Sequence, residues 1–199
     1  MNRQQLEHII RAAGDVIIED EIIVVGSQAL LGAEADGLPR SVLVSREADV
    51  MARVDPDGAK ALRINGAIGE LSRFDSTHGY YAQGVELSLL RLPLGWFERC
   101  TVVENENTRG VRGYCLELHD ICVSKLLAGR EKDSDYVGAL LRSGHAKPET
   151  LIERFAQTEM SEQERDRVAT TLVRFRRPGR RSEFRRALRR VGEGGSPGS

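Results

Sequence analysis

Residues 22–50 constrain the fold most, because an apolar run, a Gly-Ser step and an acidic pair follow one another there. Residues 22–25 read Ile-Ile-Val-Val, which favours a buried strand, and Gly26 ends the run. Ser27 suits the N-cap of a short helix over residues 28–31, since its hydroxyl can accept a hydrogen bond from a free backbone amide. A strand that leads through glycine into a helix start directs free N–H groups at one point, which predicts an anion site at Gly26 and Ser27.

The following strand carries Glu47 and Asp49. Alternation along a strand places both carboxylates on one face, where they can bind a hard divalent cation whose shell is completed by substrate phosphates. Each motif is common by itself, because strand–glycine–helix turns occur throughout α/β proteins and Glu-X-Asp occurs on solvated strands. Their order resembles the nucleotidyltransferase superfamily, whose signature is Gly-Ser or Gly-Gly followed by a spaced acidic pair.

The rest of the chain predicts an α/β core over residues 1–118, a helical part over residues 119–190 and a disordered tail over residues 191–199. In the core we expect a helix over residues 2–13 ended by Gly14, and a strand beginning at Ser41. Another helix should follow the turn at residues 55–58, with Asp55 as N-cap and Pro56 in its first turn, and run to about residue 71. Further strands are expected over residues 85–90, 101–103 and 113–116. The C-terminal helices are expected over residues 120–128, 132–142, 148–157, 161–173 and 182–190.

Composition excludes several classes of function. Three cysteines without CxxC or Cys/His spacing fit buried thiols in a reducing cytoplasm better than zinc or disulfides. The four histidines form no hydrolase or zinc spacing. No apolar run approaches the roughly 18 residues that a membrane span requires, so we expect a cytoplasmic protein without a membrane partner.

A more specific resemblance appears once the downstream helices are included. Gly-Ser-Gln-Ala-Leu-Leu-Gly at residues 26–32, Ser-Arg-Glu-Ala-Asp at 45–49, and His-Asp with Ser-Lys-Leu and Ala-Gly-Arg-Glu-Lys-Asp at 119–133 stand in order. Together they resemble a bacterial family of uncharacterised nucleotidyltransferase-like proteins related to AbiEii-type toxins of toxin–antitoxin systems. The resemblance covers roughly residues 22–145. It implies a polymerase-β-type nucleotidyltransferase core with a mixed sheet, although a fold does not fix the chemistry.

The resemblance also implies roles for individual residues. Gly26 and Ser27 would hold the nucleotide triphosphate, and Glu47 and Asp49 would bind Mg²⁺ or Mn²⁺. Glu86 would be a third metal ligand on a neighbouring strand; the alternative is an outward polar residue.

The same resemblance assigns roles in the helical part. Lys125 and Lys132 would reach phosphate oxygens, and Asp133 would orient a lysine or bind metal. The alternative makes Lys132 and Asp133 a surface pair at a helix start, where Asp suits the dipole. The long gap from Ser27 to Glu47, and Glu in place of Asp at residue 47, leave open a degenerate, non-catalytic site.

Residues 174–190 hold nine arginines and two phenylalanines. This composition fits either contacts to a nucleic-acid backbone with stacking on bases, or a terminal helix that is solvated or docked on an acidic face. The sequence therefore predicts a metal-dependent nucleotidyltransferase that transfers a nucleoside monophosphate from an NTP to an RNA, protein or small-molecule acceptor. A cognate antitoxin and a homo-oligomer are candidate partners. The second reading is an inactive protein on the same fold that binds a nucleotide, a partner or nucleic acid.

Overall fold

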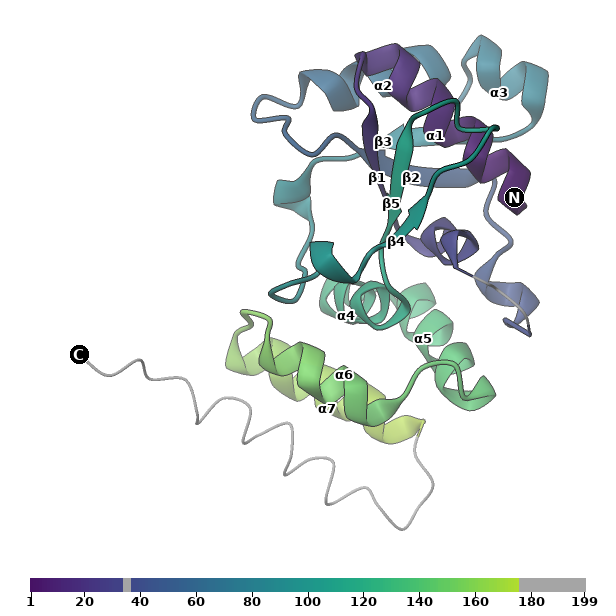
Figure 1. The fold of residues 1–199 in the computed structure, drawn as a ribbon. Helices are drawn as coiled ribbons and strands as arrows, with labels where there is room; N and C mark the ends of the chain where they lie inside the picture. Colours follow the sequence, from purple (N-terminus) through teal and green to yellow (C-terminus); the bar gives the residue numbers. More distant parts are fainter. Residues whose placement is uncertain (34–36, 176–199) are drawn as a thin grey trace. The chain divides into compact units, whose positions relative to one another are not determined.

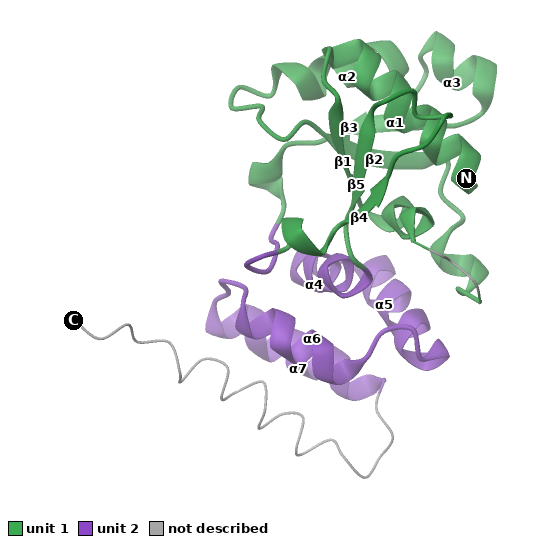
Figure 2. Ribbon diagram, in the orientation of Figure 1, with its two compact units in different colours: residues 1–90, 96–117 green, residues 91–95, 118–199 purple. Residues whose placement is uncertain are grey.

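The structure is a computed structural model that describes residues 1–33 and 37–175. The chain divides into two compact units (Figure 2): Met1–Leu90 with Trp96–Glu117, and Arg91–Gly95 with the chain from Leu118 onward. The sequence does not indicate that Arg91–Gly95 belongs with the second unit. Two contacts explain it, since the Leu94 amide donates to the Gln157 carbonyl at 2.8 Å and Arg91 pairs with Glu164 at 3.3 Å.

The first unit is built on a five-stranded mixed sheet with the order β3-β2-β1-β5-β4 (Figure 1). The strands are β1 Glu21–Val25, β2 Glu47–Met51, β3 Tyr81–Gly84, β4 Thr101–Val103 and β5 Arg112–Cys115. β1 pairs antiparallel with β2 and parallel with β5, while β2 and β3 are parallel and β4 and β5 antiparallel. This confirms the α/β class with a mixed sheet and the strands predicted near residues 22–25, 101–103 and 113–116.

The two faces of this sheet bury different residues. Along β2, Ala48 and Val50 are fully buried, whereas Glu47 and Asp49 are half-buried, because successive side chains point to opposite faces. The polar face of β2 therefore carries both carboxylates, as the alternation predicts.

Two helices cover the apolar face, α1 Arg3–Ile17 and α2 Ala59–Ile68. They approach the sheet so closely that glycine is required beneath them. A Cβ on Gly84, the β3 partner of Val50, would collide with the backbone of Ala61 in α2. A Cβ on Gly113 of β5 would collide with Ile10 of α1.

Helix α1 is longer than the sequence predicts. It begins with a capping box between Asn2 and Gln5 and ends at Ile18, a residue in the left-handed region. The prediction that Gly14 ends the helix is wrong. Gly14 lies inside the helix, where an added Cβ would meet the Glu19 carbonyl and the Val111 side chain.

The start of β2 and the start of α2 also differ from the predictions. Arg40–Val42 forms a 3₁₀ turn, so β2 begins at Glu47 and not at residue 41. Helix α2 follows Gly58 in the left-handed region, so Pro56 lies before the helix and not in its first turn. The N-cap is Gly58 and not Asp55 as predicted, although the Asp55 carboxylate accepts from the amides of Lys60 at 3.0 Å and Ala61 at 2.9 Å in the first turn.

The predicted strand over residues 85–90 is wrong. The chain stays extended only to Val85, whose amide donates to the Val50 carbonyl at 2.9 Å, and then forms a 3₁₀ turn over Leu87–Leu89. The apolar side chains of Leu87 and Leu89 are exposed, so their alternation does not mark a core face. The strand that pairs with β2 on the side away from β1 is β3, which follows the short helix α3 Arg73–His78.

The second unit is helical, as predicted. It contains α4 Leu118–Ala128, α5 Glu131–Ser143, α6 Pro148–Ala156 and α7 Glu162–Arg174. The capping box predicted from Ser161 and Glu164 is present at the start of α7. Its core includes the fully buried side chains of Ile121, Leu140, Leu151 and Phe155.

The helix predicted over residues 182–190 and the tail over 191–199 lie outside the described residues, as does the central part of the loop before residue 40. Within the described part of the chain, no helix has both the length and the apolar character that crossing a membrane requires.

Candidate active site

The Gly-Ser step forms a tight turn at the end of β1. Gly26 has φ 67° and ψ −164°, a conformation that is open essentially only to glycine. Ser27 is the first residue of a 3₁₀ turn, Ser27–Gly32, and makes no side-chain cap, so the predicted N-cap role is wrong. Its Oγ instead lies 3.4 Å from Nε2 of the buried Gln28. This 3₁₀ segment is too short to carry a strong helix dipole, so anion binding here would rest on local N–H groups and the Ser27 hydroxyl.

Asp49 lies directly against this turn. It is the register partner of Val25, the residue before Gly26. A Cβ built on Gly26 would overlap the Asp49 Oδ2 atom, so the carboxylate occupies the space beside the glycine Cα. Position 26 therefore requires glycine for two reasons: the backbone conformation there and the close approach of the Asp49 carboxylate.

Glu47 shares the polar face of β2 with Asp49, and hydrogen bonds fix both its backbone and its carboxylate. Ser45 Oγ contacts both the Glu47 amide, at 3.0 Å, and the Glu47 carbonyl, at 3.1 Å. The Tyr81 hydroxyl donates to Glu47 Oε2 at 2.9 Å, across the register pair that joins β2 to β3. Burial, followed by the hydrogen bond to Glu47 and nearby negative charge, raises the pKa of Tyr81 to about 12. The hydroxyl consequently keeps its proton near neutral pH.

The fold does not place Glu86 beside the carboxylates of Glu47 and Asp49. It follows β3, and its Oε1 lies beside Gly58 at the start of α2. The residue beside Asp49 on β3 is Gln83. Within residues 1–33 and 37–175, no three His, Cys, Asp or Glu side chains are placed to share a metal ion. Two carboxylates offer oxygen donors that fit a hard divalent cation needing further ligands from substrate, which is the usual environment of Mg²⁺.

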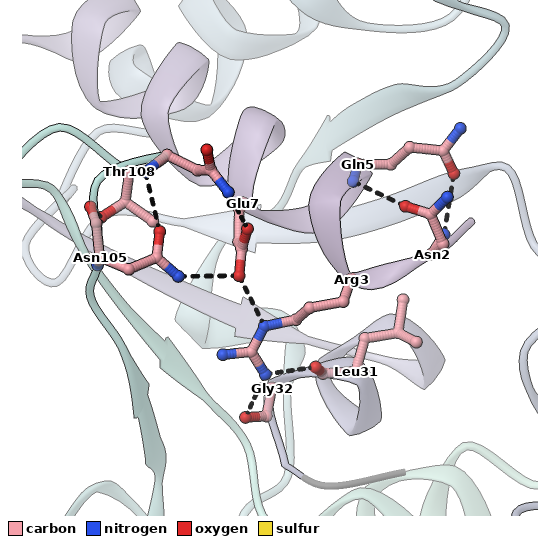
Figure 3. Close-up of polar contacts among 9 residues, drawn as sticks. Asn2, Arg3, Gln5, Glu7, Leu31, Gly32, Asn105 and Thr108 are labelled. Atoms are coloured by element: carbon pink, nitrogen blue, oxygen red, sulfur yellow. Dashed lines mark hydrogen bonds and ion pairs between the residues drawn. The ribbon is translucent and has the colours of Figure 1, made fainter. Parts of the chain in front are cut away.

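A polar network centred on the buried Glu7 carboxylate holds the far end of the Gly-Ser turn (Figure 3). Arg3 of α1 donates to the carbonyls of Leu31 and Gly32 at 2.6 Å each, and its Nε pairs with Glu7 at 2.9 Å. Glu7 is 5% exposed and also accepts from Asn105 and Asn107 at 2.8 Å.

The pKa of Glu7 reflects this network. Burial alone would raise the pKa of this carboxyl, but the hydrogen bonds from Asn107, Arg3 and Asn105 outweigh it and lower the pKa. Helix α1 thus fixes the turn through an ionised carboxylate.

In the second unit, Asp133 is the centre of a separate charged cluster. It is 2% exposed and accepts from Lys125 Nζ at 3.2 Å and Arg130 Nε at 2.6 Å. The Lys125 ammonium also lies 4.6 Å from the centre of the Tyr136 ring. Asp133 therefore pairs with Lys125, and a role of this lysine at phosphate oxygens stays a prediction. The alternative of a surface pair with Lys132 is wrong, since Asp133 is buried and its partners are Lys125 and Arg130, while Lys132 is exposed.

Other residues of the matched motifs tie helices of the second unit together. Asp120 of α4 is fully buried, and its Oδ1 lies 3.1 Å from Arg154 Nε of α6. His119 Nε2 accepts from the Lys147 amide at 3.0 Å. These contacts give the His-Asp motif a structural role within the unit.

Reasoning from sequence did not find Tyr81, Gln83 or the Arg3–Glu7 network. Tyr81 could have been found only through its pairing with Glu47. That pairing requires a strand over residues 81–84, for which the sequence pattern is weak. Glu7 looks like a solvated residue on α1, because the loop that supplies its asparagine partners lies about 100 residues later. These are contacts of the tertiary fold.

The first unit combines a mixed sheet with a Gly-Ser turn, and one carboxylate packs against the glycine while a second lies on the same strand face. These features define a nucleotidyltransferase-like α/β protein. The comparison with family models agrees: residues 4–189 match the family described as nucleotidyltransferase of unknown function (DUF6036). The chain belongs to this family. No curated protein and no solved structure matches it.

Proposed function

We propose that the protein is a metal-dependent nucleotidyltransferase that moves a nucleoside monophosphate from an NTP to an acceptor. The observation that carries the proposal is the packing of the Asp49 carboxylate against Gly26, with Glu47 on the same strand face. This arrangement joins a candidate phosphate-binding turn to two oxygen ligands, in a chain of the nucleotidyltransferase family.

In the proposed reaction, an acceptor oxygen bonds to the α-phosphorus. The bond from that phosphorus to the bridging oxygen of the β-phosphate breaks, pyrophosphate leaves with the electron pair, and the acceptor proton passes to water. Glu47 and Asp49 would hold Mg²⁺ or Mn²⁺, which supplies charge neutralisation at the phosphates. The Gly26 turn and the Ser27 hydroxyl would orient the triphosphate, so catalysis would consist mainly of positioning.

The family resemblance also implies phosphate-binding roles for Lys125 and Lys132, which both belong to the second unit. Lys125 is held by Asp133, whereas Lys132 is exposed at the start of α5. Lys132→Met should weaken binding of a non-hydrolysable NTP without changing stability. Lys147→Met is the matched control, because Lys147 is also exposed and precedes a helix of the same unit. Equal nucleotide dissociation constants in the two variants would remove Lys132 from the proposal.

The acceptor would be RNA, a protein side chain or a small molecule. Arginines of residues 174–190 favour RNA, and most of them lie outside the described residues. The resemblance to AbiEii-type toxins supports a role in toxin–antitoxin or defence systems, with a cognate antitoxin as partner. In that case expression of the parent should arrest bacterial growth, and expression of Asp49→Asn should not.

The proposal is tested by incubating the purified chain with each α-labelled NTP, Mg²⁺ and either total RNA or cell lysate. Label should enter one acceptor fraction with the parent and not with Asp49→Asn. The control is Asp15→Asn, which makes the same substitution at an exposed residue of the first unit. The proposal fails if no NTP donates label, or if Asp49→Asn transfers label as well as the control does.

A catalytically inactive nucleotide-binding or partner-binding protein is the second candidate. Two observations favour it. The described residues contain no third acidic ligand beside Glu47 and Asp49, and Asp133 is already paired with Lys125 and Arg130. Such a protein would bind an NTP analogue with Mg²⁺ and yet transfer no label to any fraction.

A further inference from the structure

The Tyr81–Glu47 pair is fixed by more than its own hydrogen bond. The Tyr81 amide donates to the Arg46 carbonyl at 3.1 Å, next to the residue whose carboxylate the phenol contacts. Arg46 in turn pairs with the buried Asp75 of α3 and donates to the Gly79 carbonyl at 2.7 Å. The start of β2 and the start of β3 are thereby locked together, which sets the position of the phenol relative to the carboxylate.

The hydrogen bond uses only one carboxylate oxygen of Glu47. Tyr81 donates to Oε2, and within the described part of the chain no protein group donates a hydrogen bond to Oε1. Tyr81 stands on β3 at the position paired with Glu47, while Gln83 stands at the position paired with Asp49. The phenol therefore restricts Glu47 to an orientation on the face that also carries Asp49.

We infer that Tyr81 is a positioning residue of the candidate metal site, holding Glu47 Oε2 so that Oε1 is presented to a divalent cation together with Asp49. This inference rests on the proposed function, because it requires that the two carboxylates bind a cation. Tyr81 touches neither substrate nor cation in this role and acts through Glu47.

A phenol donor suits this task. It donates one hydrogen bond to a single carboxylate oxygen, and partners that orient a metal-binding carboxylate commonly contribute 10- to 100-fold to metal affinity. A merely structural cross-strand pair would add to stability but would not change metal affinity through Glu47. The two roles therefore give different results in a double-mutant cycle.

The test measures the Mn²⁺ dissociation constant of the full chain, by electron paramagnetic resonance of free Mn²⁺, with a saturating non-hydrolysable NTP. Tyr81→Phe removes the hydroxyl and keeps the ring. The matched control is Tyr80→Phe, the same change one residue earlier, where the lost partner is His8 Nδ1 at 2.8 Å. Glu47→Gln and the double variant Glu47→Gln/Tyr81→Phe complete the cycle, and urea unfolding verifies that each variant is folded at the assay temperature.

We expect Tyr81→Phe to weaken Mn²⁺ binding about 10- to 100-fold, Tyr80→Phe to change it less than about twofold, and Tyr81→Phe to add nothing once Glu47 is Gln. If Glu47→Gln binds Mn²⁺ like the parent, the proposed metal site is wrong and the inference falls with it. If Glu47→Gln weakens binding but Tyr81→Phe does not, only the inference about Tyr81 is overturned. An equal effect of Tyr81→Phe in both backgrounds also overturns it, because Tyr81 would then act independently of Glu47.

Discussion

Replacing Gly26 with alanine tests the contact on which the candidate site depends. The substitution adds one methyl group at a residue with φ 67° and ψ −164°. That methyl would occupy the place of the Asp49 Oδ2 atom. Gly26→Ala should therefore both strain the backbone and displace the carboxylate.

The expected cost has two parts. A non-glycine residue in this backbone region costs on the order of 1–3 kcal/mol. Turning the Asp49 side chain out of its rotamer to admit the methyl adds roughly 0.5–1.5 kcal/mol. Gly26→Ala should thus lower the free energy of unfolding by about 2–4 kcal/mol, and it should abolish nucleotidyl transfer because Asp49 has moved.

A double-mutant cycle separates these parts. In an Asp49→Ala background the carboxylate is gone, so Gly26→Ala should cost only the backbone part, and the coupling should be about 0.5–1.5 kcal/mol. Gly79→Ala is the matched control. Gly79 also has a positive φ, 74°, but an added Cβ meets nothing within 4 Å. Urea unfolding gives the free energies for the parent, the three variants of the cycle and the control.

Two results together would contradict this prediction. One is a cost for Gly26→Ala no larger than that for Gly79→Ala. The other is the absence of coupling between Gly26→Ala and Asp49→Ala. The carboxylate would then not lie against the glycine, and the link between the turn and the acidic pair would be lost.

Three further predictions concern the rest of the chain. Glu7→Gln should lower stability by about 2–3 kcal/mol at neutral pH, because a buried carboxylate loses charge-assisted hydrogen bonds. The pKa of Glu7 is lowered in the folded protein, so the stabilisation by its carboxylate is present above the ordinary pKa of 4.5 and is lost as pH falls through the lowered pKa. A difference in stability between parent and Glu7→Gln that does not change with pH would contradict this prediction. Asp133→Asn should cost about 3 kcal/mol in urea unfolding, against less than about 0.5 kcal/mol for the exposed Asp135→Asn; equal costs would contradict the buried pairing. Deleting residues 176–199, which removes eight arginines, should flatten the salt dependence of RNA affinity, and an unchanged slope would exclude phosphate contacts by this segment.

Local patterns in the sequence identified the elements whose signals are strong. The β-branched run of β1 and the capping box of α7 are such signals, and both elements lie where they were expected. The sequence was misleading where packing decides the outcome. Gly14 looks like a helix end but fills a close contact inside α1, and Leu87 and Leu89 alternate like a strand but face solvent.

Periodicity and chain order are enough to predict the α/β class, the helical second unit, and the position of Glu47 and Asp49 on one strand face. They do not predict which residues contact these two carboxylates in the folded chain. Strand register set Asp49 against Gly26 and Tyr81 against Glu47 and left Glu86 beside Gly58, because register and helix packing depend on contacts between segments far apart in the chain.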